Sequence, residues 1–137
     1  MLVGDDVNII IAGGRHIVDR SLLFRLFDES RLLKQAACVF HGACRGVDVI
    51  GEEWAQGHGL VTISFEVTPA DWRVIGRRAG PLRNAAMLAA FADGLVVVLD
   101  DKCKGSWDMK RQADKDLLPV EVFNLSTWKI SRARLIT

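Results

Sequence analysis

Three short loops of this sequence carry residue types suited to holding a phosphate group. They are Gly13 to His16, His41 to Asp48, and a charged loop that ends at Lys104-Gly105-Ser106. Glycines let backbone amides approach a ligand with no side chain in the way. An arginine, such as Arg15 in the first loop, can hold a phosphate by two parallel hydrogen bonds. These residue types predict an anionic, phosphate-bearing ligand.

The loop from His41 to Asp48 is the most informative of the three. Gly46 precedes a predicted helix, whose first amides and positive end can face an anion. Asp48 can accept hydrogen bonds from ribose hydroxyls, and the competing interpretation is stabilisation of the first helical turn. His41 ends a predicted strand, where a histidine is more often structural than catalytic. A metal site that combines it with Cys44 and Cys103 is a weaker hypothesis, because the ligands would come from separate loops.

The stretch from residue 66 to residue 84 adds an aromatic ring and more positive charge. Residues 66–80 show little apolar periodicity and predict a long irregular connection, which in a compact domain is either functional or disordered. Its Trp72 could stack on a nucleobase or, equally, belong to a lid packed on the core. Pro81 suits the first turn of a helix, and Arg83 and Asn84 in that turn could reach the same crevice.

Apolar segments immediately before the three loops must position them. Val7–Ala12, Ala36–Phe40 and Gly94–Leu99 are continuous apolar runs, typical of parallel strands buried on both faces. Leu60–Phe65 and Pro119–Phe123 predict two more strands, and amphipathic helices separate all five. This alternation implies parallel pairing with right-handed crossovers. If the first strand lies between the second and the fourth, all three loops meet where open α/β sheets bind ligands.

The expected fold is therefore α/β, a Rossmann-like three-layer sandwich with a parallel sheet of about five strands. We predict a single domain over residues 1–137, with its core at 7–123. The basic tail, residues 124–137, could add an edge strand, pack on a neighbour or fray. Ser106 is expected to cap the helix that follows the third loop.

Composition excludes several classes of function. The 137 residues carry a formal net charge of +1, which gives no general argument for nucleic-acid or membrane binding. No apolar run approaches the length of a membrane span, no secretory leader is visible, and the three cysteines lack tight spacing. Free thiols in the cytoplasm are expected. The G-x-G-x-x-G fingerprint and the P-loop motif are both missing, and no cofactor is predicted.

Five motifs in order resemble the SLOG superfamily, and most closely its small YspA-type proteins of bacteria and phages. The motifs are Gly13-Gly14-Arg15, His41-Gly42-Ala43-x-x-Gly46-x-Asp48, Asp71-Trp72, Ala79-Gly80-Pro81-x-Arg83-Asn84-x-x-Met87 and Gly105-Ser106-x-x-Met109. The superfamily includes DNA-processing DprA-type proteins and LOG phosphoribohydrolases, which release cytokinin bases from nucleotides. The resemblance implies a Rossmann-like fold, a phosphate pocket and frequent homodimers.

This chain departs from the LOG pattern after its fourth predicted strand. LOG enzymes carry Pro-Gly-Gly-x-Gly-Thr-x-x-Glu there, whereas this sequence has Asp101-Lys102-Cys103-Lys104 in place of Pro-Gly-Gly-x, and Met109 at the catalytic glutamate. A thioether cannot act as a general base. Arg83 does match the arginine of the LOG pattern. Catalysis of the LOG kind is therefore not expected from these residues.

The leading hypothesis is a module that binds a nucleotide or nucleotide-derived small molecule, as a sensor or sequestering protein. One alternative is an N-glycosidic hydrolase with a rearranged acid, such as Asp71, Asp100, Asp101 or Asp108. The other is a DNA-associated protein by analogy with DprA, against which the neutral charge argues. The predicted ligand-binding residues are Gly13, Gly14, Arg15, His41, Gly42, Ala43, Gly46, Asp48, Trp72, Arg83, Asn84, Lys104, Gly105 and Ser106, with no metal ion.

Overall fold

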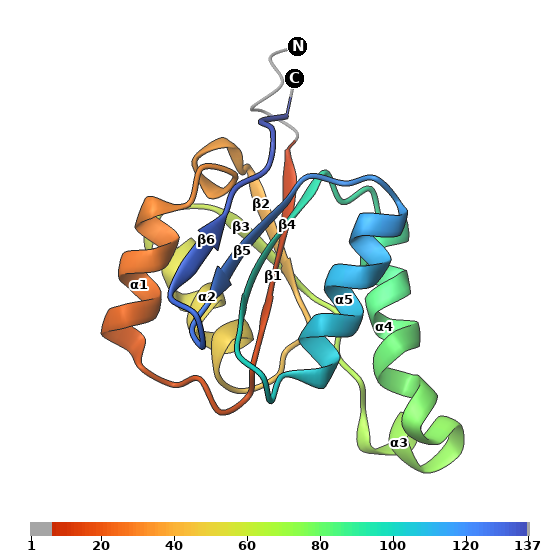
Figure 1. Cartoon of the computed structure of the whole chain (residues 1–137). Coiled ribbons are helices and arrows are strands. Elements are labelled where there is room, and N and C mark those ends of the chain that lie inside the picture. The colour runs from red at the N-terminus through yellow and green to blue at the C-terminus, as the bar shows by residue number, and fades with distance from the viewer. Residues whose placement is uncertain (1–6, 137) are drawn as a thin grey trace.

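A six-stranded sheet with strand order β3-β2-β1-β4-β5-β6 forms the centre of the computed structural model, which describes residues 7–136 (Figure 1). The strands are β1 (Asn8–Gly13), β2 (Cys38–His41), β3 (Val61–Ser64), β4 (Gly94–Leu99), β5 (Val120–Asn124) and β6 (Lys129–Ser131). The first five are parallel, and β6 pairs antiparallel with β5. The five predicted strands are thus confirmed, and part of the tail adds a sixth at the edge.

Helices cover both faces of the sheet and make the three-layer α/β fold that the alternation of strands and helices predicts (Figure 1). One layer holds α1 and α2, and the other holds α4 and α5, with α3 extending below α4. Their bounds, with two short 3-10 helices, are α1 (Arg20–Glu29), η2 (Leu33–Gln35), α2 (Val47–Gly57), α3 (Pro69–Ile75), η3 (Gly76–Arg78), α4 (Ala79–Ala89) and α5 (Lys104–Lys115). Within residues 7–136, none of these helices is both long and apolar enough to cross a membrane.

The core follows from the apolar runs that define the strands. All six residues of β4 are buried, as are Ile9, Ile10 and Ile11 of β1. Because β1 and β4 are central strands, their side chains point into both helical layers in turn. On one face they meet residues such as Phe27, and on the other residues such as Met109.

The segment predicted to be irregular, residues 66–80, is largely helical, which corrects that expectation. Thr68 and Asp71 form a capping box, and Pro69 occupies the first helical turn of α3. These local signals suffice for a short helix. Apolar periodicity does not indicate this helix, because α3 buries none of its residues and so has no amphipathic stripe.

Two helix starts also differ from the expected ones. Helix α4 begins at Ala79, two residues before Pro81, because η3 leads into it without a break. Helix α5 begins at Lys104 with Cys103 at the N-cap position, and no side chain caps it. Ser106 is therefore inside the first turn and does not cap the helix.

The central position of β1 brings together the loops that follow β1, β2 and β4. It pairs with β2 on one side and with β4 on the other, as the convergence of the loops requires. The carboxyl ends of these three strands lie at the end of the molecule near α3 (Figure 1). The loops that follow them therefore share one edge of the sheet.

Candidate ligand-binding site

The loops after β1 and β2 are joined by close backbone contacts. Gly46 has φ +83°, and its backbone lies so near the first loop that a Cβ would come within 2.5 Å of the Gly14 carbonyl oxygen. That same oxygen accepts a hydrogen bond from the Val47 amide at 3.4 Å. The Gly14 amide in turn donates to the Val98 carbonyl of β4 at 3.3 Å. Glycine is required at position 46 both by conformation and by space.

A cavity of about 390 Å³ lies between the loops that follow β1, β2 and β4, helix α4 and the N-terminal half of α5. It brings together residues from all three predicted loops. Nine of the predicted site residues line it: Gly13, Gly14, Arg15, Asp48, Arg83, Asn84, Lys104, Gly105 and Ser106. Its other lining residues are Ala12, His16, Cys44, Met87, Lys102, Cys103 and Met109. We call it the main cavity.

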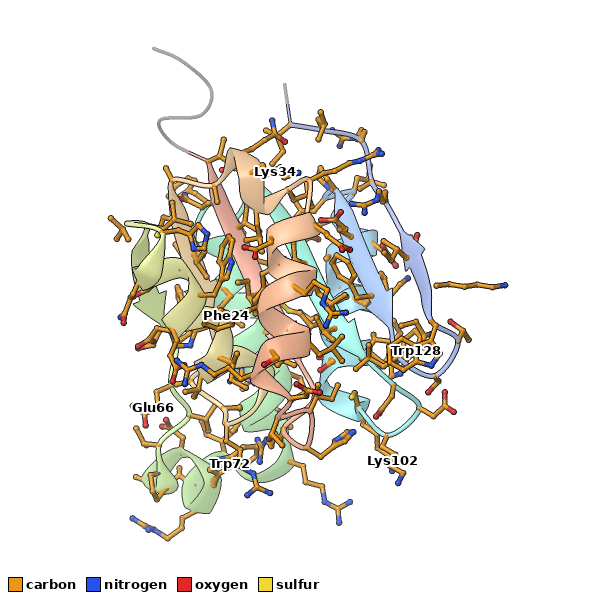
Figure 2. The ribbon with its side chains drawn as sticks, turned by 90° about the vertical axis from the view of Figure 1, so that its left-hand side faces the viewer. Phe24, Lys34, Glu66, Trp72, Lys102 and Trp128 are labelled. Atoms are coloured by element: carbon orange, nitrogen blue, oxygen red, sulfur yellow. The ribbon has the colours of Figure 1, made fainter. Side chains whose placement is uncertain are left out.

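A second hollow of about 230 Å³ adjoins the main cavity, because Arg15, Cys44 and Arg83 line both. Gly42, Ala43 and Trp72 also line this second hollow. Trp72, on α3, has 40% of its surface exposed. Figure 2 shows Trp72 and Lys102 at the same end of the molecule, opposite Lys34.

Arg83 lies at the boundary of the two hollows, and its guanidinium is held in place. Nη1 donates to the Gly42 carbonyl oxygen at 2.8 Å, and Nε donates to Asn84 Oδ1 at 3.0 Å. A Cβ on Gly42 would lie 2.2 Å from Nη1, so this arrangement needs a glycine there. Among residues 7–136, Nη2 has no hydrogen-bond acceptor. Arg83 therefore keeps donors available for an anion.

Asn84 connects the start of α4 to the start of α5. Its Nδ2 donates to Asp108 Oδ2 at 3.0 Å and to the Gly105 carbonyl oxygen at 3.4 Å. The first turn of α5, with Gly105 and Ser106 on the cavity wall, is thereby fixed against α4. The Lys104 amide donates to the Lys102 carbonyl oxygen at 3.2 Å. Because no side chain caps α5, the next amides, those of Gly105 and Ser106, remain available to an anion.

Asp48 is buried and organises the second loop from within. Its Oδ2 accepts hydrogen bonds from the Gly42 amide at 3.0 Å and the Cys44 amide at 3.4 Å. Burial raises the pKa of Asp48 to about 6, although the nearby Arg83 opposes that rise. The carboxylate stabilises the loop as well as lining the cavity, and its contact with a ribose stays a prediction.

His41 and Gly46 line neither hollow. His41 is buried, its Nδ1 accepts a hydrogen bond from the Ala43 amide at 3.0 Å, and its Nε2 pairs with Glu52. Gly46 packs against the first loop instead of facing the cavity. Both residues shape the loops that carry the site.

The carboxylates considered for a rearranged acid do not line the main cavity. Asp71 caps α3, Asp101 is exposed, and Asp108 accepts hydrogen bonds from Asn84 and from Gln112. Asp100 pairs with His16 at 2.6 Å, and this contact holds the pKa of Asp100 at about 2. Met109, at the LOG glutamate position, is buried on the cavity wall.

The structure does not group His41 and Cys44 with Cys103, as the hypothesis of a metal site supposed, and within residues 7–136 only Cys103 of these three residues belongs to a cluster of candidate metal ligands. Cys103 lies with His16 and Asp100, and the candidate ligand atoms of the three are within 4.8 Å of one another. Burial raises the pKa of the Cys103 thiol to about 11. His16 follows β1 and Asp100 follows β4, so only the pairing of these two strands could have predicted their proximity.

A family model matches residues 7–74, and it describes the YspA, cpYpsA-related SLOG family, abbreviated YAcAr. The Gene 61 protein of Mycobacterium phage D29 is 35% identical over 117 residues, which cover 82% of this chain and 92% of that protein. This chain belongs to the YAcAr family of the SLOG superfamily. Membership agrees with the resemblance predicted from the five motifs.

The YAcAr chain also resembles a solved structure, that of DNA processing protein A (DprA) from Streptococcus pneumoniae. The two superpose with a TM-score of 0.66 at 17% sequence identity, over 88% of this chain and 51% of that one. The YAcAr chain thus spans about half of the DprA structure. At this level of identity, the likeness shows a common Rossmann-type fold.

Proposed function

We propose that this YAcAr protein binds a nucleotide or a nucleotide-derived, phosphate-bearing small molecule, as a sensor or sequestering module. The observation that carries the proposal is the convergence of the three strand-end loops on the main cavity. Its lining includes the positively charged side chains of Arg15, Arg83, Lys102 and Lys104. A small concave site with several fixed polar groups is the usual form of a ligand site.

The phosphate end of the ligand would lie against α5. The first turn of this helix offers the Gly105 and Ser106 amides and the Ser106 hydroxyl, and the Lys104 side chain adds a cation beside them. Arg83 approaches from α4 with Nη2 still available. Helix dipole, amides and guanidinium all favour an anion at this position.

The base end of the ligand would lie in the second hollow. Trp72 offers an aromatic face there, and Arg15 and Arg83 connect this hollow to the main cavity. Together the two hollows provide a charged compartment next to an aromatic one. This division matches the chemistry of a nucleotide, with its anionic phosphate and its planar base.

The proposal is tested by thermal-shift and calorimetric screening of nucleotides and ADP-ribose compounds. A ligand at 100 times its Kd should stabilise the wild type by about 2.7 kcal/mol. Arg83→Gln should abolish most of that stabilisation, whereas Arg25→Gln, on the exposed face of α1, should retain it. A broad panel without any stabilising compound would contradict the proposal.

Asp48 favours one second candidate, an N-glycosidic hydrolase. It is a buried carboxylate on the cavity wall, and its pKa of about 6 allows it to carry a proton near neutral pH. Incubation with nucleoside monophosphates, followed by chromatography for free base, tests this activity. Turnover that Asp48→Asn abolishes would establish it, and no free base would exclude it for those substrates.

A further inference from the structure

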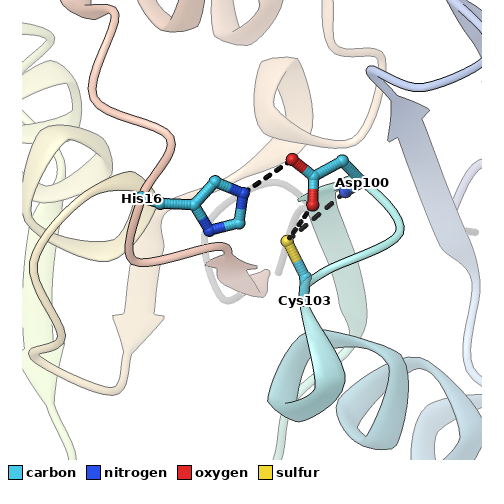
Figure 3. Close-up of side chains that lie close together, drawn as sticks. All are labelled: His16, Asp100 and Cys103. Atoms are coloured by element: carbon cyan, nitrogen blue, oxygen red, sulfur yellow. Dashed lines mark hydrogen bonds and ion pairs between the residues drawn. The ribbon is translucent and has the colours of Figure 1, made fainter.

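Three side chains with different donor atoms meet at the rim of the main cavity (Figure 3). His16 Nε2 lies 2.6 Å from Asp100 Oδ2, and Cys103 Sγ lies 3.2 Å from Asp100 Oδ1. His16 belongs to the loop after β1, and Asp100 and Cys103 belong to the loop after β4. The sheet brings them together, because β1 and β4 are direct neighbours.

The absence of a side chain at Gly14 is a second, independent feature that allows this cluster to form. A Cβ at Gly14 would lie 2.5 Å from Cys103 Sγ and 3.0 Å from His16 Cε1. Any larger residue would displace the sulfur, which is otherwise fixed at the N-terminus of α5. Gly14 thus lets the Cys103 sulfur and the His16 ring approach the backbone of the first loop.

We propose that His16, Asp100 and Cys103 bind a divalent transition-metal ion, with Zn²⁺ as the best match. One imidazole nitrogen, one carboxylate oxygen and one thiolate sulfur are the donor types that Zn²⁺ takes in proteins. Cys103 is a thiol that donates to Asp100 Oδ1, and it would release this proton to solvent when its sulfur binds the ion. Mg²⁺ and Ca²⁺ are disfavoured, because they prefer sites made of oxygen ligands.

The geometry needs only a small adjustment to accept the ion. Tetrahedral Zn²⁺ with bonds of about 2.0–2.3 Å separates its donors by roughly 3.3–3.7 Å. The three donors here already lie within 4.8 Å of one another, and the shortest contact, between His16 and Asp100, must open. Their side chains are 44% and 24% exposed, respectively, so both have space to move.

Three protein ligands leave a fourth position on a tetrahedral ion. His16 and Cys103 both line the main cavity, so this position would be on the cavity side. Water would occupy it in the absence of a ligand. A phosphate oxygen could replace that water, an extension that rests on the proposed nucleotide binding.

The test is titration of the whole protein with Co²⁺ and Zn²⁺ in the absence of any nucleotide. One Co²⁺ ion should bind to each chain and give a thiolate-to-cobalt charge-transfer band. Added Zn²⁺ should displace the Co²⁺ and remove the band. Cys103→Ser should remove the band. It should also weaken Zn²⁺ binding by roughly 100-fold or more, since even losing a residue behind a ligand costs 10–100-fold.

Cys44→Ser is the matched control, because this second cysteine also lines the main cavity but lies outside the cluster. It should leave the band and the Zn²⁺ affinity unchanged. His16→Gln keeps the test decisive if Cys103→Ser fails to fold, because this exposed side chain can be replaced without disturbing the core. It should weaken Zn²⁺ binding while the band shifts.

If the wild-type protein forms no one-to-one complex with Co²⁺, the proposed metal site is wrong. A band that survives in Cys103→Ser, or one that depends on Cys44, would also overturn it. Nucleotide binding is measured separately and without metal, so failure here leaves the proposed function standing. Conversely, a metal complex without nucleotide binding would support this site alone.

Discussion

Arg83 owes its position to the missing side chain of Gly42. The guanidinium occupies the space that a Cβ would fill, and it donates to the carbonyl oxygen of the same glycine. Gly42 directly follows β2, and Arg83 lies in the second turn of α4. Their contact links α4 to the loop after β2.

Gly42→Ala should therefore weaken ligand binding more than it weakens the fold. The new Cβ would lie 2.2 Å from Arg83 Nη1, and the flexible end of that side chain can move away. We expect nucleotide affinity to fall by roughly tenfold, as loss of a charge-assisted hydrogen bond implies, with a smaller change in unfolding free energy. Calorimetry and urea unfolding measure the two effects.

Gly57→Ala is the control for this substitution, because its Cβ would meet nothing within 4 Å. It should leave nucleotide affinity at the wild-type value. Equal affinities for Gly42→Ala and wild type would show that the position of Arg83 does not matter for binding.

Asp48 makes the stability of the fold depend on pH. Its ordinary pKa of 3.8 rises to about 6 in the folded protein, so the folded state keeps a proton that the unfolded state has released. Stability should fall as pH rises from about 4 to about 6 and should not change further above that window. This pKa difference corresponds to about 3 kcal/mol at most.

Asp48→Asn should remove this pH dependence, because the amide oxygen can still accept from the two loop amides but carries no charge. Urea unfolding between pH 4 and pH 8 gives the difference between the two proteins. As pH rises, the unfolding free energy of the wild type should fall relative to that of Asp48→Asn. Parallel profiles for the two proteins would contradict the burial argument.

At the scale of elements, the contact between the first two loops depends on Gly46. Its φ of +83° disfavours any side chain, and a Cβ there would also collide with the carbonyl oxygens of Gly14 and Arg15. Backbone atoms cannot rotate away as a side chain can. Gly46→Ala should therefore cost at least about 2 kcal/mol of unfolding free energy.

Gly76→Ala separates backbone conformation from steric collision. Gly76 has φ +73° and ψ −144°, close to the φ +83° and ψ −129° of Gly46, but its Cβ would meet nothing within 4 Å. It should cost less than Gly46→Ala, because only the conformational part of the cost remains. Urea unfolding of both variants isolates the contribution of the loop contact, and equal costs would contradict it.

Elements that bury apolar residues could be predicted from the sequence. An element that buries no residue could not be predicted in this way. Continuous apolar runs, such as Gly94–Leu99 in β4, marked the parallel strands because both faces of these strands are covered. Helix α3 buries nothing, so only its capping box could have indicated it. Glycines before helices also marked the loops that line the cavity.

Proximity between loops required the strand order, which a single sequence does not contain. The cluster of His16, Asp100 and Cys103 depends on β1 lying beside β4. The structural roles of His41 and Gly46 also depend on tertiary contacts, with Glu52 and Gly14 respectively. Phosphate binding inferred from residue types stays a prediction, and topology decided which of these residues meet.

At the scale of the whole molecule, the C-terminal segment stabilises a buried charge at the sheet. Glu121 of β5 is fully buried, accepts hydrogen bonds from Ser30 Oγ and the Arg31 amide, and pairs with Arg132 at 2.6 Å. Arg132 follows β6 directly. The edge strand therefore brings in the cation that compensates Glu121.

Arg132→Gln should destabilise the fold by about 3–5 kcal/mol, because it leaves a buried carboxylate without its cation. Arg134→Gln, which loses only an exposed contact with the Leu117 carbonyl, should cost less than about 1 kcal/mol. Adding Glu121→Gln to Arg132→Gln should recover part of the loss. Urea unfolding tests all three, and equal costs for the two arginines would contradict the buried pair.

We expect the ligand to bind in the main cavity, and one pair of variants tests this most directly. Gly105 lies on the cavity wall and Gly57 at the far end of α2, and a Cβ at either meets nothing within 4 Å. Calorimetric titration of a nucleotide that stabilises the wild type should show no binding to Gly105→Trp and wild-type affinity for Gly57→Trp. Full affinity in Gly105→Trp would contradict the account.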